Sequence, residues 1–124
     1  MPEQVIRVLS DLHFGDRSSR IARPQALAPL AEGVDGWIIN GDSLDTRPGI
    51  SPAYTAEIRG RLDGFLHSLG FPVTQLTGNH DPDVSALHRL ELANGRVFLT
   101  HGDVLYPEIV PWGLDAGEIR AMIE

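Results

Sequence analysis

The chain has 124 residues, of which 42% are hydrophobic and 22% charged, and its formal net charge is −7. This length and composition indicate one globular domain over residues 1–124, and the acidic balance argues against non-specific nucleic-acid binding, which needs a basic surface. The chain has no cysteine, which excludes disulfides and thiolate metal sites. Because the sequence shows no signal peptide and no apolar run of membrane-spanning length, we expect a cytoplasmic protein without a transmembrane segment.

The first third of the chain predicts two strands separated by a short helix. Residues 5–9 form a β-branched, apolar run interrupted by one arginine, which is typical of a strand buried over most of its surface. Pro24 favours the start of a helix, which Pro29 makes irregular and Gly33 ends. Residues 37–39, which follow an Asp-Gly turn, predict the second strand.

A long helix and a third strand follow. Between Tyr54 and Leu69, six apolar residues fall on one stripe with a helical period. Gly70 stands where a left-handed C-cap belongs, and Pro72 prevents continuation of the helix. Residues 73–77 then predict the third strand.

The last part of the chain predicts a hairpin and the start of another helix. Residues 90–92 and 97–100 alternate in polarity on either side of Asn94-Gly95, which is a strong signal for a tight turn between antiparallel strands. Residues 114–124 carry apolar side chains at helical spacing. Strands alternating with helices, plus one hairpin, predict an α/β fold with a mostly parallel sheet.

Four short polar segments come directly after the predicted strands. Because the carboxyl ends of parallel strands converge on one crevice in an open α/β sheet, we expect these segments to meet there. Their carboxylates, amide oxygen and imidazoles suit hard to borderline divalent metal ions. The segments are Asp11-Leu12-His13, Gly41-Asp42-Ser43-Leu44-Asp45, Gly78-Asn79-His80-Asp81 and His101-Gly102-Asp103.

Five residues of these segments are candidate metal ligands. Asp11 and His13 are two positions apart, so in an extended segment their side chains point the same way and can hold one ion. The two carboxylate oxygens of Asp42 can bridge two cations, as two-metal hydrolysis requires. Asn79 offers a neutral oxygen that limits the negative charge, and His101 offers a second nitrogen from the opposite side.

His80 is the candidate catalytic acid. Its neighbour Asp81 is expected to orient the imidazole and to raise its pKa, so that His80 protonates the leaving-group oxygen. Asp45 and Asp103 are expected to accept hydrogen bonds from ligand histidines or loop amides rather than to bind metal. His67 is expected to be a solvated surface residue.

The order D-x-H, G-D-x-x-D, G-N-H-D and H-G-D resembles the calcineurin-like metallophosphoesterases over residues 5–103. The resemblance implies a four-layer α/β/β/α sandwich with a binuclear centre of two divalent ions (Mn, Fe, Zn or similar). It implies an enzyme that hydrolyses a phosphomonoester or phosphodiester with a metal-activated water. The residues that it implies are Asp11 and His13 for the first metal, Asp42 for the bridge, Asn79 and His101 for the second metal, and His80 for the substrate phosphate.

Two details of the sequence refine this resemblance. Ser10-Asp11-Leu12-His13 together with the late His-Gly-Asp segment is most similar to the bacterial branch that contains UDP-2,3-diacylglucosamine hydrolases, in which arginine usually stands where this chain has His80. Family members also carry a later G-H-x-H segment that gives one histidine to each metal, and the remaining His67 and His88 lie outside such a segment. We therefore expect residues 1–124 to be an incomplete domain, the N-terminal part of the sandwich.

The residues leave two other interpretations open. One is a catalytically impaired metal-binding or regulatory fragment that lacks the C-terminal histidine ligands. The other is a flavodoxin-like binding domain that uses Asp11 and Asp42 without metal. If the second half of the sandwich is absent, the sheet exposes an apolar face and an unpaired edge, so we expect a homo-oligomer that covers this face. The expected small-molecule partner of the hydrolase is a phosphoester substrate.

Overall fold

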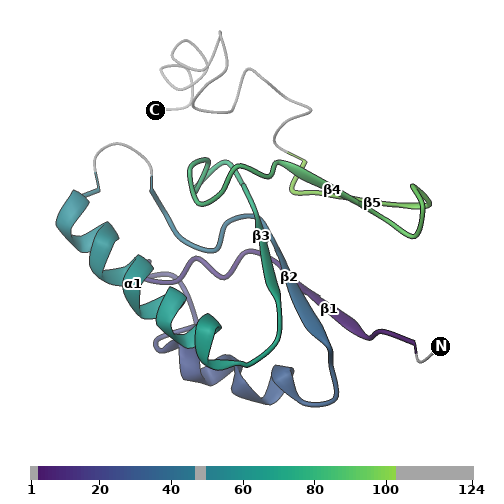
Figure 1. Ribbon diagram of the computed structural model, residues 1–124. Coiled ribbons are helices and arrows are strands. Elements are labelled where there is room, and N and C mark those ends of the chain that lie inside the picture. The colour runs from purple at the N-terminus through teal and green to yellow at the C-terminus, as the bar shows by residue number, and fades with distance from the viewer. Residues whose placement is uncertain (1–2, 47–49, 103–124) are drawn as a thin grey trace, which may run out of the picture.

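The computed structural model describes residues 3–46 and 50–102, which form an α/β fold (Figure 1). Strands β1, β2 and β3 form a parallel sheet in that order, and β4 and β5 form a separate antiparallel hairpin. This confirms the predicted α/β class with a mostly parallel sheet and a hairpin. The helix expected at 114–124 lies outside the described residues. The elements are β1 (Ile6–Leu9), the 3-10 helix η1 (Pro24–Ala31), β2 (Gly36–Asn40), α1 (Pro52–Ser68), β3 (Val73–Leu76), β4 (Arg89–Leu92) and β5 (Val97–Thr100).

Both helices cover the same face of the parallel sheet (Figure 1). Trp37 and Ile39, alternate residues of the central strand β2, belong to one buried apolar cluster with Leu62 and Phe65 of α1 and with Leu27 of η1. Helix α1 supplies the apolar stripe that its sequence predicts, and it ends at Ser68, close to the predicted C-cap. The core therefore lies between β2 and the two helices, and it fixes the strands whose ends carry the polar segments.

The first helix is a 3-10 helix over its whole length. It begins at Pro24 and contains Pro29. Proline has no N–H group, and its ring clashes with the carbonyl four residues earlier, so an α-helical bond pattern is excluded there and the tighter 3-10 turn results. The predicted irregular helix is thus confirmed.

The opposite face of the sheet is partly open at β1. Ile6 and Val8 are 38% and 46% exposed, whereas Leu9 packs against the core cluster. At the sheet edge opposite β1, the segment that follows β3 covers the outer edge of this strand. There Ser85 Oγ donates a hydrogen bond to the carbonyl of Gln75 at 2.7 Å. The self-association expected from the sequence stays a prediction.

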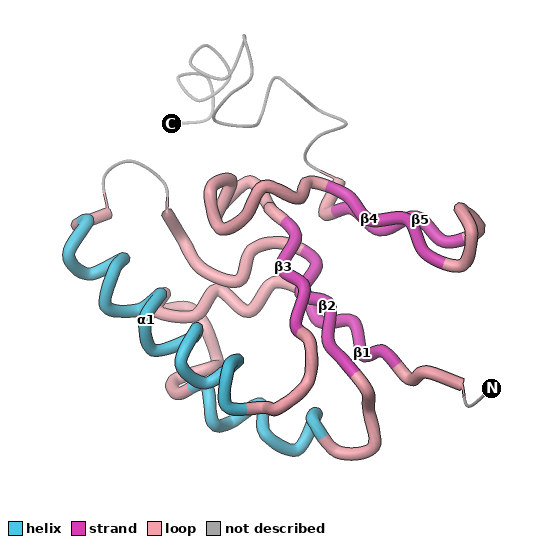
Figure 2. Tube along the Cα trace, in the orientation of Figure 1, coloured by secondary structure: helices cyan, strands magenta, loops and turns pink. Residues whose placement is uncertain are grey.

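The β4–β5 hairpin leads the chain back towards the carboxyl ends of the parallel strands (Figure 2). Its strands pair from Arg89 with Thr100 to Leu92 with Val97, so the turn comprises residues 93–96. The hairpin predicted from Asn94-Gly95 is confirmed, with a turn two residues longer than the tightest form. Among the described helices, none is both long and apolar enough to cross a membrane.

Candidate metal centre

The loops after β1, β2 and β3 are joined to one another by backbone hydrogen bonds. The N–H of Asp11 donates to the carbonyl of Gly41 at 3.1 Å, and the N–H of His13 donates to the carbonyl of Asp42 at 2.9 Å. The loops after β2 and β3 are joined in the same way, through Thr46 N–H and the carbonyl of His80 at 2.8 Å. The polar segments therefore meet at the carboxyl edge of the sheet, where the sequence places them (Figure 2).

The backbone at three candidate ligands is left-handed. Asp11, His13 and Asp42 have φ angles of 58°, 48° and 55°. This corrects the expectation that Asp11 and His13 share an extended segment: β1 ends at Leu9, and the chain then turns sharply at both ligands. Their side chains nevertheless approach each other, with His13 Nε2 at 3.5 Å from Asp11 Oδ1. Asp and His are among the non-glycine residues that tolerate this conformation best.

Two groups of side chains lie close enough together that each could hold a metal ion. One contains Asp11, Asp42 and His101, and the other contains His13, Asp42 and His80; in each group one ligand atom per residue lies within 4.8 Å of the others. Asp42 is buried and belongs to both groups. Its Oδ2 lies 3.2 Å from His101 Nε2 and 3.7 Å from His13 Nε2. Asp42 would therefore be the ligand shared by two ions, if each group held one.

The two groups divide the residues differently from the division implied by the resemblance. Asp11 is grouped with His101, although its Oδ1 lies closer to His13 Nε2 (3.5 Å) than to His101 Nε2 (3.8 Å). His80 is grouped with His13, and their two imidazole rings are 4.9 Å apart. Asn79 lies in the same loop as His80 and is half-buried. Its role as a ligand stays a prediction.

Asp81 has a different place from the one predicted. Its side chain is fully buried, and both carboxylate oxygens accept hydrogen bonds from backbone N–H groups of two loops. These donors are Asp42 and Gly78 to Oδ1, both at 2.9 Å, and Ser43 and Leu44 to Oδ2 at 2.7 and 3.2 Å.

These bonds correct the expectation that Asp81 orients the His80 imidazole. Its oxygens already serve four backbone donors, so it holds the loop after β2 against the loop after β3. Burial raises the pKa of the Asp81 carboxyl, and the four N–H donors act in the opposite direction. No signal in the sequence distinguishes this role, because three of the four donors, in the loop after β2, lie far along the chain from Asp81.

The carboxylate beside the His80 ring is Asp45. Its Oδ2 lies 3.6 Å from the buried Nδ1 of His80, longer than a hydrogen bond but within the range of an ion pair. The expectation that Asp45 accepts a hydrogen bond from a ligand histidine or a loop amide stays a prediction. Asp103, expected to act in the same way, lies outside the described residues.

The loops pack so closely that Gly78 has no room for a side chain. A Cβ there would lie 2.6 Å from the backbone nitrogen of Asp42 and would overlap its carboxylate. The N–H of His80 donates to the same carboxylate, at 3.0 Å from Oδ1. One oxygen of Asp42 is thus fixed by the backbone, and the other faces the histidines.

The residues present fit divalent cations. Among the described residues, the ion-pair partners of Asp11 and Asp42 are imidazoles, so the carboxylates gather negative charge without an arginine to neutralise it. Oxygen and imidazole ligands together suit Mn, Fe or Zn. The imidazole of His101 donates through Nδ1 to a backbone carbonyl at 2.9 Å, which is the usual way in which a metal-binding histidine is oriented.

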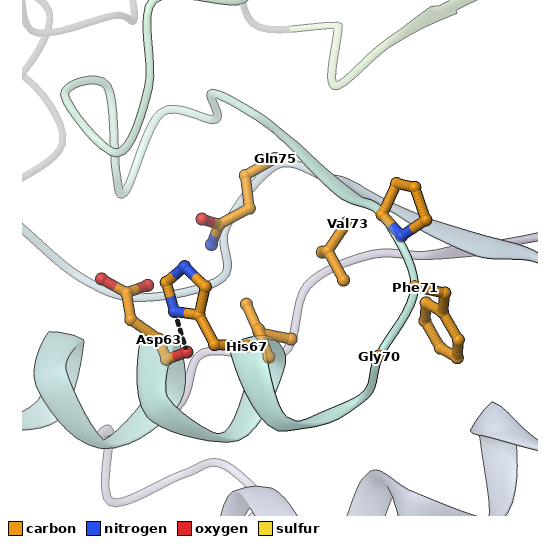
Figure 3. Close-up of a pocket in the computed structure, with 8 residues that line it drawn as sticks. Asp63, His67, Gly70, Phe71, Val73 and Gln75 are labelled. Carbon is orange, nitrogen blue, oxygen red and sulfur yellow. Dashed lines mark hydrogen bonds between the residues drawn. The ribbon is translucent and has the colours of Figure 1, made fainter.

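A hollow at the end of α1 lies away from this centre. It has a volume of about 450 Å³ and lies between the end of α1 and β3, where Asp63, His67 and Gln75 line it (Figure 3). His67 is exposed, as predicted, and its Nδ1 donates to the carbonyl of Asp63 at 2.8 Å. None of the candidate ligands lines this hollow.

No family model matches the chain, and no curated protein matches it. Among solved structures, the chain is similar to the crystal structure of a conserved uncharacterized protein from Streptococcus pneumoniae TIGR4, described as a predicted phosphoesterase, with 23% sequence identity and a TM-score of 0.44. The match covers 98% of this chain, which spans 59% of the length of that protein. The functional assignment therefore rests on the residues of this chain.

Proposed function

We propose that this chain is a metal-dependent phosphoester hydrolase, which binds two divalent ions of Mn, Fe, Zn or a similar metal and cleaves a phosphomonoester or phosphodiester. The observation that carries the proposal is the position of Asp42, which belongs to both groups of possible ligands. The four ordered motifs support the same conclusion, because each one follows a strand that the structure describes.

The two groups have the chemistry that phosphoester hydrolysis needs. Asp11 and His101 would hold one ion and His13 the other, with Asp42 between them, and Asn79 is proposed as an additional oxygen ligand. Divalent ions bound there supply Lewis acidity for a phosphoryl oxygen and lower the pKa of a water molecule. The open, partly exposed side of the centre at Asp11 leaves room for a phosphate group.

His80 is proposed as the residue that donates a proton to the leaving-group oxygen. Its Nδ1 is buried next to Asp45, which leaves Nε2 as the atom available to a substrate. His80 is also placed to bind an ion with His13 and Asp42. Replacement of His80 separates these two roles: loss of a proton donor lowers turnover, whereas loss of a ligand also lowers the number of bound ions.

The proposal is tested with the purified chain, stripped by a chelator and then supplied with Mn²⁺ or Zn²⁺. We expect two bound ions by calorimetry, and metal-dependent hydrolysis of p-nitrophenyl phosphate or bis(p-nitrophenyl) phosphate. Asp42→Asn should lose both, because it removes the charge of the shared ligand. Asp63→Asn, on α1 and outside the ligand set, is the matched control and should change neither.

Other outcomes identify the competing interpretations. One weakly bound ion without turnover would make the chain a catalytically impaired metal-binding protein. If chelator and metal change neither stability nor activity, the chain is a binding domain that uses its carboxylates without metal, and the proposal fails.

A further inference from the structure

His101 reaches the candidate metal centre from a different sheet than the other ligands. The β4–β5 hairpin carries it, and neither hairpin strand pairs with β1, β2 or β3. Val97 and Phe98 of the hairpin are 42% and 51% exposed, so the hairpin is not fixed by deep apolar burial of these side chains. Contacts with the end of β2 therefore contribute to the position of His101, beside the bonds from Thr77 to Leu87 and His88 that anchor the start of the hairpin.

Asn40 and Gly41, at the end of β2, form a seat for His101. The carbonyl of Asn40 accepts a hydrogen bond from His101 Nδ1 at 2.9 Å, and its side-chain amide Nδ2 donates to the carbonyl of Thr100 at 3.1 Å. Gly41 leaves the space that the imidazole fills, because a Cβ there would lie 2.6 Å from His101 Cβ. The residue before the ligand and the ligand itself are thus held by the same strand end.

These contacts also select the tautomer of His101. A backbone carbonyl only accepts hydrogen bonds, so Nδ1 carries a proton and Nε2 is the ring nitrogen left for an ion. Nε2 is the atom that lies 3.2 Å from Asp42 Oδ2 and 3.8 Å from Asp11 Oδ1. The seat consequently turns Nε2 of His101 towards the carboxylates of its group.

We propose that Asn40 is a positioning residue that holds His101 in the group formed with Asp11 and Asp42. The proposal rests on the metal-dependent function proposed above, since it states which ion depends on Asn40. The group of His13, Asp42 and His80 does not depend on it, because those residues lie in loops that are joined to one another by backbone bonds and by Asp81.

The first test uses metal-free protein. In ¹⁵N–¹H spectra of the wild-type chain, we expect a protected Nδ1–H proton on His101. Asn40→Leu, which keeps the approximate shape and removes the amide, should lose this protection because Thr100 is released. Ser68→Ala is the matched control: it removes the hydrogen bond that Ser68 Oγ donates to the carbonyl of Phe65 at 2.6 Å, away from the hairpin, and should leave the His101 signals unchanged.

The second test counts ions by calorimetry with Mn²⁺ or Zn²⁺. Asn40→Leu should lower the affinity for one of the two ions by at least about 10-fold, the usual effect of losing a residue that orients a ligand. The affinity for the other ion should stay unchanged. His101→Ala should weaken the same ion, and the double variant should be no worse than His101→Ala, because Asn40 acts through His101. If Asn40→Leu does not fold, Asn40→Ser removes the same amide with a smaller change.

The outcomes separate this proposal from the proposed function. If the wild type binds ions but does not hydrolyse phosphoesters, the function fails, whereas the spectra and the titrations still decide the role of Asn40. Unchanged His101 signals in the Asn40 variants, or equal weakening of both ions, would overturn the positioning role. Additive losses in the double variant would overturn it as well, since they would show that Asn40 acts independently of His101.

Discussion

The loops of the parallel sheet and the β4–β5 hairpin both bring ligands to the candidate centre, but different interactions hold them. The sheet loops are tied together by a fully buried carboxylate that serves four backbone N–H groups. On the hairpin side, Asn40 bonds to Thr100 through its side chain and to His101 through its carbonyl. The loops after β2 and β3 are therefore held by buried bonds, and we expect local opening to reach the hairpin before it reaches them.

The largest expected effect comes from replacing Asp81, whose carboxylate joins the loops after β2 and β3. Asp81→Ala leaves four buried N–H groups without an acceptor, and we expect it to lower the free energy of unfolding by about 3–5 kcal/mol. Chemical denaturation measures this loss. Asp83→Asn, two residues further on and 67% exposed in its side chain, should cost less than about 1 kcal/mol. Equal losses in the two variants would show that Asp81 does not hold the loops.

Gly78→Ala tests how tightly the sheet loops pack. The new Cβ would overlap Asp42, so we expect a loss of about 1–3 kcal/mol, as for other overpacked sites, together with weaker binding of both ions. The matched control is Gly64→Ala on α1, where a Cβ has no neighbour within 4 Å. There the same change should stabilise the helix by about 0.5–1 kcal/mol. Thermal denaturation should therefore show shifts of opposite sign, and two shifts of the same sign would contradict the close packing of the loops.

Gly41→Ala tests the hairpin side. Gly41 has a φ of 86° and faces His101, so the variant carries backbone strain of about 1–2 kcal/mol and also displaces the imidazole. Gly95→Ala, at a φ of 83° with open space around it, carries the strain alone. We expect a larger loss of stability in denaturation experiments for Gly41→Ala than for Gly95→Ala, and a selective loss of one bound ion in Gly41→Ala. Two bound ions of unchanged affinity in that variant would show that His101 does not need the seat.

The smallest expected effect concerns Asp16, in the turn after His13. The backbone N–H of Ser18, and then its hydroxyl, lower the pKa of the Asp16 carboxyl. A carboxyl with a lowered pKa in the folded state stabilises the fold above its unfolded pKa, and this contribution disappears as the pH falls through the folded pKa. Asp16→Asn should therefore be slightly less stable than the wild type at pH 7, with a difference that vanishes in acid. Urea denaturation of both proteins at pH 7 and in acid checks this prediction. A difference in the free energy of unfolding that grows in acid would contradict it.

The sequence predicts the sheet side of the molecule better than its hairpin contacts. Strand ends can be predicted because apolar runs stop at polar segments, and this alone places Asp11, Asp42 and His80 at one edge of the sheet. The left-handed backbone at Asp11 is not predictable in this way, since only tertiary hydrogen bonds favour it there. The role of Asn40 is hidden because an asparagine at the end of an apolar strand also has a simpler interpretation as a turn residue.

The left-handed φ angles at Asp11, His13 and Asp42 restrict which replacements these positions accept. Glycine, asparagine, aspartate and histidine adopt this conformation at low cost, whereas β-branched residues rarely do. A library that varies these codons would therefore lose folded protein for reasons unrelated to metal binding. Asparagine is the replacement that removes the charge and preserves the backbone, so Asp42→Asn separates the loss of a metal ligand from a loss of folding.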